Sequence, residues 1–164
     1  MRVGIGYDIH QVTPERPLLL GGIMIPDGPG LAGHSDADVL LHAICDALLG
    51  AAGFGDIGEH FPDTDPALAG IDSAVLLERT IAMVRSDGWY IENIDSIIFA
   101  EIVKISPWKA RMKERIGALL KIDPMRINIK AKTMEHCDAV GCKEAVAASC
   151  VILLSRVSSP AKGA

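Results

Sequence analysis

The first ten residues constrain the fold most strongly, because glycine, acid and histidine alternate along them. Residues 1–3 are typical of the start of a β-strand, in which residues two apart point to the same face. Asp8 and His10 are therefore expected side by side on one face. Gly4 and Gly6 carry no side chain, so another backbone or a ligand can come close there. The pattern predicts either half of a zinc site or a turn with a buried, hydrogen-bonded acid and histidine.

The acidic, aliphatic composition excludes several classes of protein. The chain has 164 residues, of which 49% are hydrophobic and 4% aromatic, and a formal net charge of −5. This composition suits one domain with an aliphatic core. A nucleic-acid groove needs clustered Lys and Arg, so no nucleic-acid partner is expected. No segment has the pattern of a signal peptide or a membrane span, so no membrane partner is expected either.

The four cysteines indicate the compartment. They stand at positions 45, 137, 142 and 150 and form no C-x-x-C pair. Cysteines spaced in this way predict free thiols in a reducing compartment, so we expect a cytoplasmic protein.

The chain after the first strand predicts a hairpin, a loop and a helix. Two apolar runs around Gly21-Gly22 are typical of a hairpin. The prolines and glycines of residues 26–33 indicate a mobile loop. Ser35 and Asp38 have the form of a capping box, so a helix with a buried apolar stripe is predicted over residues 36–50.

His42 on that helix is the best candidate for a third metal ligand. Together with Asp8 and His10 it makes a set of one acid and two histidines. Such a set leaves the fourth tetrahedral position open, as in catalytic rather than structural zinc sites. His42 lies four residues from both Asp38 and Asp46, and either carboxylate could orient its imidazole.

The rest of the chain predicts further helices and strands around an irregular loop. Residues 53–66 are too rich in Gly, Pro and Asp for regular structure, and long loops of this kind are often functional. Two more helices are expected, over residues 72–86 and 106–121. Strands are expected in three segments, 90–103, 126–133 and 144–155. In the last of these the alanines favour a helix, but the apolar run at 151–154 suits a buried strand, which we prefer.

The mixed order of strands and helices predicts an α+β fold. We expect two layers: a mixed four-to-five-stranded sheet with about three helices on one face. Residues 1–157 are expected to form a single catalytic domain, and residues 158–164 a flexible tail.

Two polar clusters are candidates for binding an anionic ligand. Asp56, Asp63 and Asp65 share one loop, where carboxylates could accept hydrogen bonds from sugar hydroxyls or hold a second cation. A solvated turn with Asp at capping positions is the alternative. Residues 130–135 end a strand with a base, a hydroxyl and an acid, which suit phosphate and Mg²⁺. A charged strand end facing water is the alternative there.

The motifs of this chain, and their order along it, resemble those of the 2-C-methyl-D-erythritol 2,4-cyclodiphosphate synthase family of non-mevalonate isoprenoid biosynthesis. The resemblance runs essentially from end to end. It rests on Gly4–His10, Leu20–Gly22, His34–Val39 with His42, Asp46–Ala52, Gly55–Gly58, Phe61–Pro66, Lys104 with Pro107, and Lys130–Glu135.

The resemblance implies a metal-dependent phosphorus–oxygen lyase. Asp8, His10 and His42 would bind Zn²⁺, and Glu135 would bind a second ion, Mg²⁺ or Mn²⁺. The enzyme would cyclise 4-diphosphocytidyl-2-C-methyl-D-erythritol 2-phosphate to 2-C-methyl-D-erythritol 2,4-cyclodiphosphate and release CMP. The 2-phosphate that attacks is already ionised near neutral pH, so a strong general base is not required and catalysis rests on alignment.

The resemblance also implies roles for other side chains. His34 and Thr133 would stabilise the transition state. The substrate-binding residues would be Ser35 beside His34, Asp56 and Gly58 at the ribose, Phe61, Asp63 and Asp65 at the methylerythritol part, Ala100, Lys104, Ile105 and Ser106 at the cytosine, and Lys132 at the diphosphate.

Family members are homotrimers with active sites between subunits, so the resemblance implies that Asp56 and Lys104 act beside the neighbouring chain's zinc. The family often has an aromatic residue at the position of Ala139 and an arginine at that of Cys142, facing a central cavity. Neither is present here, so a ligand of that cavity is not implied.

Two other functions fit the same residues. One is a zinc-dependent nucleotide-diphosphate phosphohydrolase, and the other a non-catalytic cytidine-nucleotide binding protein. Only the cyclase releases CMP together with a cyclic diphosphate.

Overall fold

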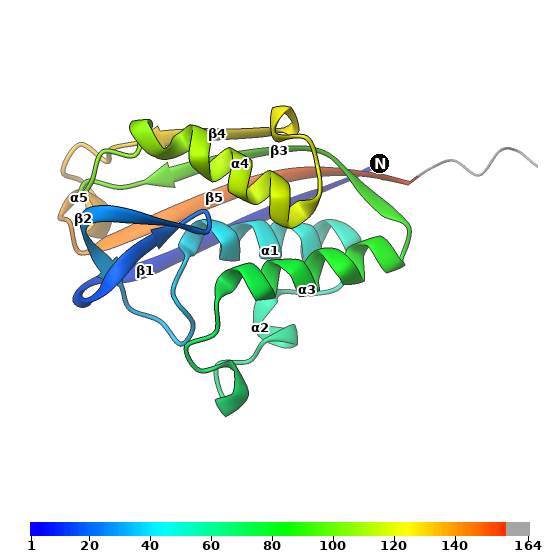
Figure 1. Cartoon of the computed structure of the whole chain (residues 1–164), viewed down its shortest axis with the longest axis horizontal. Helices are drawn as coiled ribbons and strands as arrows, with labels where there is room; N and C mark the ends of the chain where they lie inside the picture. Colours follow the sequence, from blue (N-terminus) through cyan, green and yellow to red (C-terminus); the bar gives the residue numbers. More distant parts are fainter. Residues whose placement is uncertain (157–164) are drawn as a thin grey trace, which may run out of the picture.

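A computed structural model describes residues 1–156, which form a five-stranded mixed sheet with helices packed on one face (Figure 1). In chain order its elements are β1 (Arg2–Leu20), β2 (Ile23–Leu31), α1 (Val39–Ala52), α2 (Ile57–His60), α3 (Ser73–Ser86), β3 (Trp89–Phe99), α4 (Lys109–Leu120), β4 (Ile127–Lys132), α5 (Asp138–Gly141) and β5 (Ala145–Arg156). The predicted α+β class and the three long helices are confirmed. The predicted tail, residues 158–164, lies outside the described residues.

Strand β1 organises the sheet, because it is long enough to pair with two other strands. The strand order is β2-β1-β5-β3-β4, and only β3 and β4 run parallel. Residues 2–11 of β1 pair with β5, and residues 12–20 pair with β2 through the Gly21-Gly22 hairpin. The preference for a strand over residues 144–155 is confirmed, since β5 is the central strand between β1 and β3.

Helix α1 lies directly against the first half of β1, because two glycines of that strand face it. A β-carbon on Gly4 would lie 2.0 Å from the carbonyl oxygen of Ala47, and one on Gly6 would lie 2.0 Å from that of Ala43. No side chain fits in that space. Asp8 and His10 follow on the same face of β1. The close approach of the strand and the helix therefore places both side chains beside α1.

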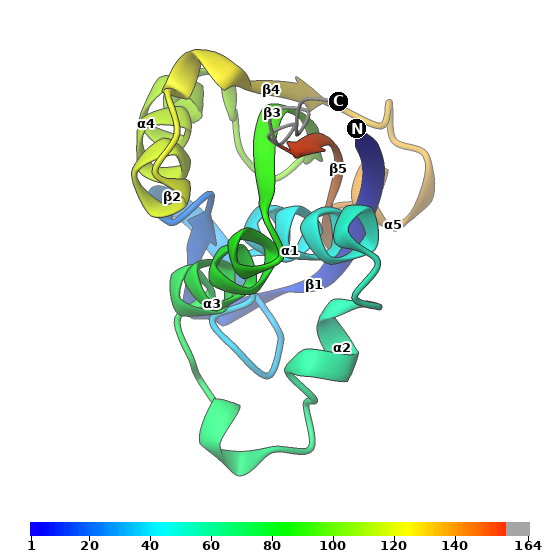
Figure 2. The same ribbon diagram turned by 90° about the vertical axis from the view of Figure 1, so that its right-hand side faces the viewer.

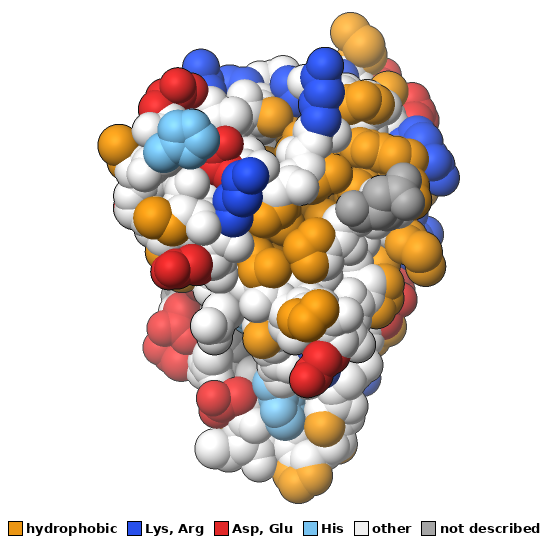
Figure 3. All heavy atoms as spheres, turned by 90° about the vertical axis from the view of Figure 1, so that its left-hand side faces the viewer, with side chains coloured by type: hydrophobic (Ala, Val, Ile, Leu, Met, Phe, Trp, Pro, Cys, Tyr) orange, Lys and Arg blue, Asp and Glu red, His pale blue; other side chains and the backbone are white. Residues whose placement is uncertain are grey.

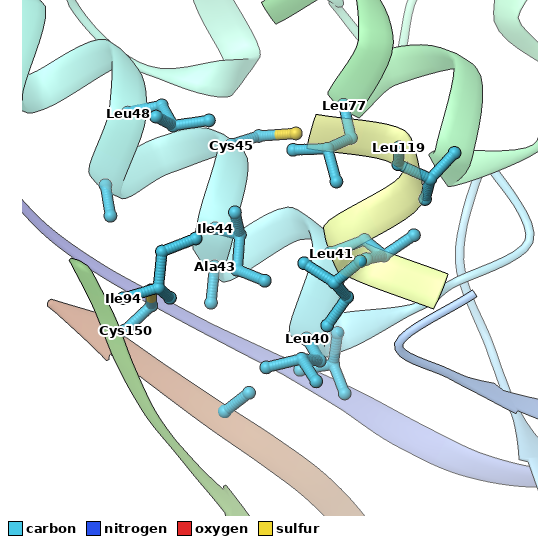
Figure 4. Packing of buried hydrophobic residues seen from close by; sticks show 14 of the residues in the cluster. Leu40, Leu41, Ala43, Ile44, Cys45, Leu48, Leu77, Ile94, Leu119 and Cys150 are labelled. Atoms are coloured by element: carbon cyan, nitrogen blue, oxygen red, sulfur yellow. The ribbon is translucent and has the colours of Figure 1, made fainter. Parts of the chain in front are cut away.

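Aliphatic side chains of α1, α3, α4 and the inner face of the sheet form the core. Figure 4 shows Leu41 and Ile44 of α1 between Leu77 of α3 and Ile94 of β3, and all four are fully or almost fully buried. The thiol of Cys45 lies in the same core, where burial raises its pKa to about 12. All four cysteines are free, as predicted. Among the described residues no helix is long and apolar enough to cross a membrane.

Two predicted boundaries are wrong. The first helix begins at Val39 rather than at residue 36, because Ala37 has a left-handed backbone (φ 62°) and Asp38 accepts the hydrogen bond from Leu41 N–H as the N-cap. Residues 26–33 are not a mobile loop: most of them belong to β2. Irregular register between β1 and β2 accommodates the prolines and glycines there.

Strand β3 ends at Phe99 rather than at residue 103, and two further differences are short helical turns. Helix α4 begins at Lys109, and residues 106–108 before it form a 3₁₀ turn. The loop predicted over residues 53–66 contains the single turn of α2, and a further 3₁₀ turn covers Pro66–Leu68. Figure 2 shows this segment projecting away from the sheet, below α1 and α3.

The close packing of β1 on α1 predicts that Gly6→Ala destabilises the protein by roughly 1–3 kcal/mol, because the new methyl group overlaps the α1 backbone. Gly50→Ala is the matched control, since its β-carbon would meet nothing closer than 3.9 Å and alanine favours the helix. Urea unfolding of both variants checks this. Equal midpoints for the two would contradict the packing argument.

Candidate active site

Three side chains with metal-binding atoms converge where β1 meets α1. Asp8 Oδ2 lies 3.0 Å from His10 Nε2 and 2.9 Å from His42 Nδ1, and the two ring nitrogens are 3.2 Å apart. In a tetrahedral zinc site with bonds of about 2.0–2.1 Å, neighbouring ligand atoms stand roughly 3.3 Å apart. The three atoms therefore lie close enough together to share one divalent cation.

The hydrogen bonds around this triangle favour a cation at its centre. His10 Nδ1 donates to the carbonyl oxygen of Ala32 at 2.7 Å, so the neutral ring keeps a lone pair on Nε2. That lone pair faces a carboxylate oxygen and a nitrogen of the second ring, and a cation relieves their repulsion. Without an ion, protonated rings can donate to the Asp8 carboxylate instead: burial raises the pKa of Asp8, but these hydrogen bonds outweigh burial and hold it well below its usual range. Burial lowers the pKa of His10, but the hydrogen bond to Asp8 outweighs burial, so the pKa lies above its ordinary value.

Neither carboxylate predicted to orient His42 does so. Asp38 is fully buried and accepts three backbone N–H groups, two from the β1–β2 hairpin and one from α1. Asp46 accepts the backbone N–H of Ile57. The spacing of four residues places both acids near His42, but each turns to backbone donors. The ring nitrogen Nε2 of His42 instead lies 2.8 Å from Ser73 Oγ, on α3.

The triangle opens into a cavity of about 490 Å³ that holds several of the predicted substrate-binding residues. The predicted residues that line it with the three ligands are His34, Ser35, Gly58, Phe61 and Asp63. Other apolar residues complete the wall: Ile57 and Pro62, which lie in the predicted motifs, and Leu68, Ile71 and Leu76, which the sequence did not single out. The open side of the triangle thus faces space for a ligand.

Two of the predicted loop carboxylates also act as helix caps. Asp56 lines an adjoining hollow of about 340 Å³ together with Asp8 and His42, and its Oδ1 accepts the N–H of Glu59 at the start of α2. Asp65 lines neither space. Its Oδ1 accepts the N–H of Ala67, and its carbonyl oxygen lies 3.2 Å from His34 Nε2.

The remaining predicted residues lie at a different place in the same chain. They lie at or just after the C-terminal ends of β3 and β4 and line neither hollow: Ala100, Lys104, Ile105, Ser106, Lys132, Thr133 and Glu135. Two strands stand between β1 and β4, so their axes are roughly 14 Å apart at the usual strand spacing. One chain therefore does not bring its two sets of predicted residues together.

The turn after β4 is held in an unusual backbone shape. Glu135, His136 and Asp138 have positive φ values of 51°, 63° and 56°, which cost energy for any residue except glycine. Thr133 Oγ1 donates to Glu135 Oε1 at 2.5 Å. Figure 3 shows this end of the molecule: hydrophobic side chains gather at the centre of the face, and Lys and Arg side chains stand above them. The hydroxyl of Thr133 and the carboxylate of Glu135 are thus hydrogen-bonded to each other in an exposed turn.

The geometry predicts that the purified chain binds one divalent ion and that His42→Ala lowers this binding by at least tenfold, because one of three ligands is lost. Metal content after dialysis and chelator competition measure it. The same circular dichroism spectrum in both proteins would show that the fold persists. Unchanged metal binding in the variant would place the ion elsewhere.

Comparisons with known proteins agree with this geometry. The profile of the YgbB family matches residues 1–155. The 2-C-methyl-D-erythritol 2,4-cyclodiphosphate synthase of Bordetella petrii is 55% identical over 96% of this chain and 97% of its own length. The solved structure of the bifunctional IspDF of Campylobacter jejuni is 41% identical, with a TM-score of 0.92 over 95% of this chain and 42% of that one. IspF of Plasmodium falciparum, solved in complex with CDP, is 34% identical, with a TM-score of 0.84 over 94% and 96%. On these matches, over nearly its whole length, the chain belongs to the YgbB family.

Proposed function

We propose that this chain cyclises 4-diphosphocytidyl-2-C-methyl-D-erythritol 2-phosphate to 2-C-methyl-D-erythritol 2,4-cyclodiphosphate, with release of CMP. The observation that carries the proposal is the open triangle of Asp8, His10 and His42 on the wall of a ligand-sized cavity. The relatives named as synthases of this product, and the complex of one solved relative with CDP, support the same reaction. Residues 1–157 are proposed as a single catalytic domain. The free thiols support a cytoplasmic enzyme.

The residues of the cavity suit a substrate with a phosphorylated polyol at one end. Three ligands of this type fit Zn²⁺, and Glu135, which lies outside the cavity of its own chain, would bind a second ion, Mg²⁺ or Mn²⁺. Divalent ions bound there would draw negative charge from the phosphoryl oxygens. Phe61 and Asp63 offer the polyol an apolar surface and a hydrogen-bond acceptor. His34 at the rim would donate a hydrogen bond where charge develops.

The protein's task is to hold two anionic groups of one substrate together. The attacking phosphate needs no strong base, because it is ionised near neutral pH. Fixing both ends of the substrate can supply roughly 7–11 kcal/mol toward the barrier. The proposed cytosine residues, Ala100, Lys104, Ile105 and Ser106, and the diphosphate residues Lys132 and Thr133 would hold the other end.

The exposed face of the sheet supports a homotrimer in which neighbouring chains complete each site. Val3, Ile5, Tyr7 and Ile9 point away from the helices on β1 and are 44–70% exposed. Val151, paired with Ile5 on β5, is 42% exposed. Soluble monomers seldom expose contiguous apolar surface of this kind. A second chain on this face would also offer a way to bring Lys104 and Thr133 of one chain to the metal ligands of another.

The reaction is tested by incubating the protein with the diphosphocytidyl substrate in the presence of Zn²⁺ and Mg²⁺. We expect CMP and the cyclic diphosphate in equal amounts, and loss of both in His42→Ala. Mass spectrometry of the products measures this. CMP with a linear bisphosphate would indicate the phosphohydrolase, and no product with retained CDP binding would indicate a binding protein.

The assembly predicts that Ile5→Lys weakens the trimer, because it places a charge in the apolar face. Met125→Lys is the matched control, since Met125 is 83% exposed but lies on the 3₁₀ turn before β4, away from this face. Sedimentation at micromolar concentration should give a trimer for the control and smaller species for Ile5→Lys, with turnover falling in parallel. A wild-type monomer with full activity would be incompatible with a shared site.

A further inference from the structure

A chain of polar groups extends from the back of His42 into the protein. Ser73, the first residue of α3, is fully buried, and its Oγ lies 2.8 Å from His42 Nε2. On its other side the Ser73 hydroxyl donates a short hydrogen bond to Asp36 Oδ1, and its backbone N–H donates to Asp36 Oδ2 at 3.1 Å. Both carboxylate oxygens of Asp36 are thus directed at one serine.

The number of protons available to His42, Ser73 and Asp36 decides which group donates each of these hydrogen bonds. A carboxylate only accepts hydrogen bonds, so the single hydroxyl proton of Ser73 points to Asp36. Ser73 Oγ can then only accept a hydrogen bond from the ring nitrogen on its other side. His42 therefore carries a proton on Nε2, and in the neutral ring the lone pair of Nδ1 faces Asp8 and His10.

We propose that Asp36 and Ser73 are positioning residues that fix the tautomer and ring orientation of His42 for metal binding. The inference rests on the proposed function, in which His42 is a zinc ligand. Histidine ligands commonly donate their other N–H to a carboxylate or a carbonyl oxygen. Here a serine hydroxyl connects the ring to the carboxylate.

A second serine beside the same ring nitrogen has a different role. Ser35 Oγ lies 3.1 Å from His42 Nε2 and accepts the N–H of Ala37 at 3.1 Å. Its nearest other hydroxyl, Ser73 Oγ, is 3.4 Å away, at the limit of a hydrogen bond. Ser35 lines the ligand cavity, whereas Ser73 does not. The hydroxyl proton of Ser35 can therefore be donated to a ligand, whereas the hydroxyl proton of Ser73 is donated to Asp36.

The segment that carries Asp36 is fixed from several directions. The Asp36 N–H donates to the Ile71 carbonyl oxygen at 3.1 Å, and the Gly70 N–H donates to the His34 carbonyl oxygen at 2.7 Å. Arg16 Nη1 donates to the carbonyl oxygen of Ser35 at 2.8 Å. The carboxylate is therefore held against the start of α3 before any metal binds.

The test compares zinc affinity in substrate-free protein by competition with a chromophoric chelator. Ser73→Ala and Asp36→Asn should each weaken zinc binding about 10–100-fold, because the ring loses its fixed acceptor. Cobalt(II) replaces zinc in a parallel measurement, and the visible absorption of its complex should shift in both variants.

Asp72→Ala is the matched control. Asp72 caps α3 through the Ala74 N–H at 2.8 Å, one residue from Ser73, and forms no hydrogen bond to His42. It should lower the unfolding midpoint yet keep the zinc affinity and cobalt spectrum of the wild type. Should Ser73→Ala fail to fold, Asp36→Asn, which keeps the size of the side chain, carries the test.

Wild-type zinc affinity and an unchanged cobalt spectrum in Asp36→Asn and Ser73→Ala would overturn the inference. So would a loss of affinity in Asp72→Ala as large as theirs, since the effect would then come from α3 as a whole. The proposed reaction is judged separately, by the products of the wild-type protein.

Discussion

The contact between the backbone of β1 and that of α1 is the constraint on which the rest of the structure depends. Two glycines let the helix approach closer than any side chain permits; α3 then packs against α1, and α4 packs against α3 and β4. The same approach brings His42 to within 2.9–3.2 Å of atoms on β1. A scaffold contact made of backbone is stiff, so the spacing of the proposed metal ligands is set by packing and not by flexible loops.

Around this contact the protein places charge where it can be balanced. Asp8 is partly buried, yet two imidazoles stabilise its charged form. Asp38, fully buried, is surrounded by backbone N–H donors and stabilises the turn into α1. Asp36 is joined to Ser73 by two hydrogen bonds. Three nearby carboxylates thus serve three different tasks, and the partner of each decides which.

The sheet separates the two halves of the proposed site while leaving one of its faces uncovered. The antiparallel strands β1 and β5 carry exposed apolar side chains on the face without helices. The polar residues proposed to bind the rest of the substrate lie at the C-terminal ends of the parallel strands β3 and β4. Both features have the same consequence: an isolated chain exposes apolar surface and keeps the proposed substrate-binding groups apart. Association through the uncovered face would address both at once.

The sequence by itself determined the elements with a strong local signal and the family resemblance, which implied the proposed metal ligands. The Gly21-Gly22 hairpin, helix α3 and strand β4 follow from local pattern, and so does the sharing of one strand face by Asp8 and His10. Only the tertiary structure decided the partner of His42, because Ser73 lies 31 positions away and reaches His42 through packing of α3 on α1. Asp36 and Ser73 are likewise 37 positions apart. The same holds for β2, whose prolines and glycines lack strand preference and are held by pairing with β1. Sequence spacing limits which groups can be near one another, but the direction in which each carboxylate turns depends on donors brought from elsewhere in the fold.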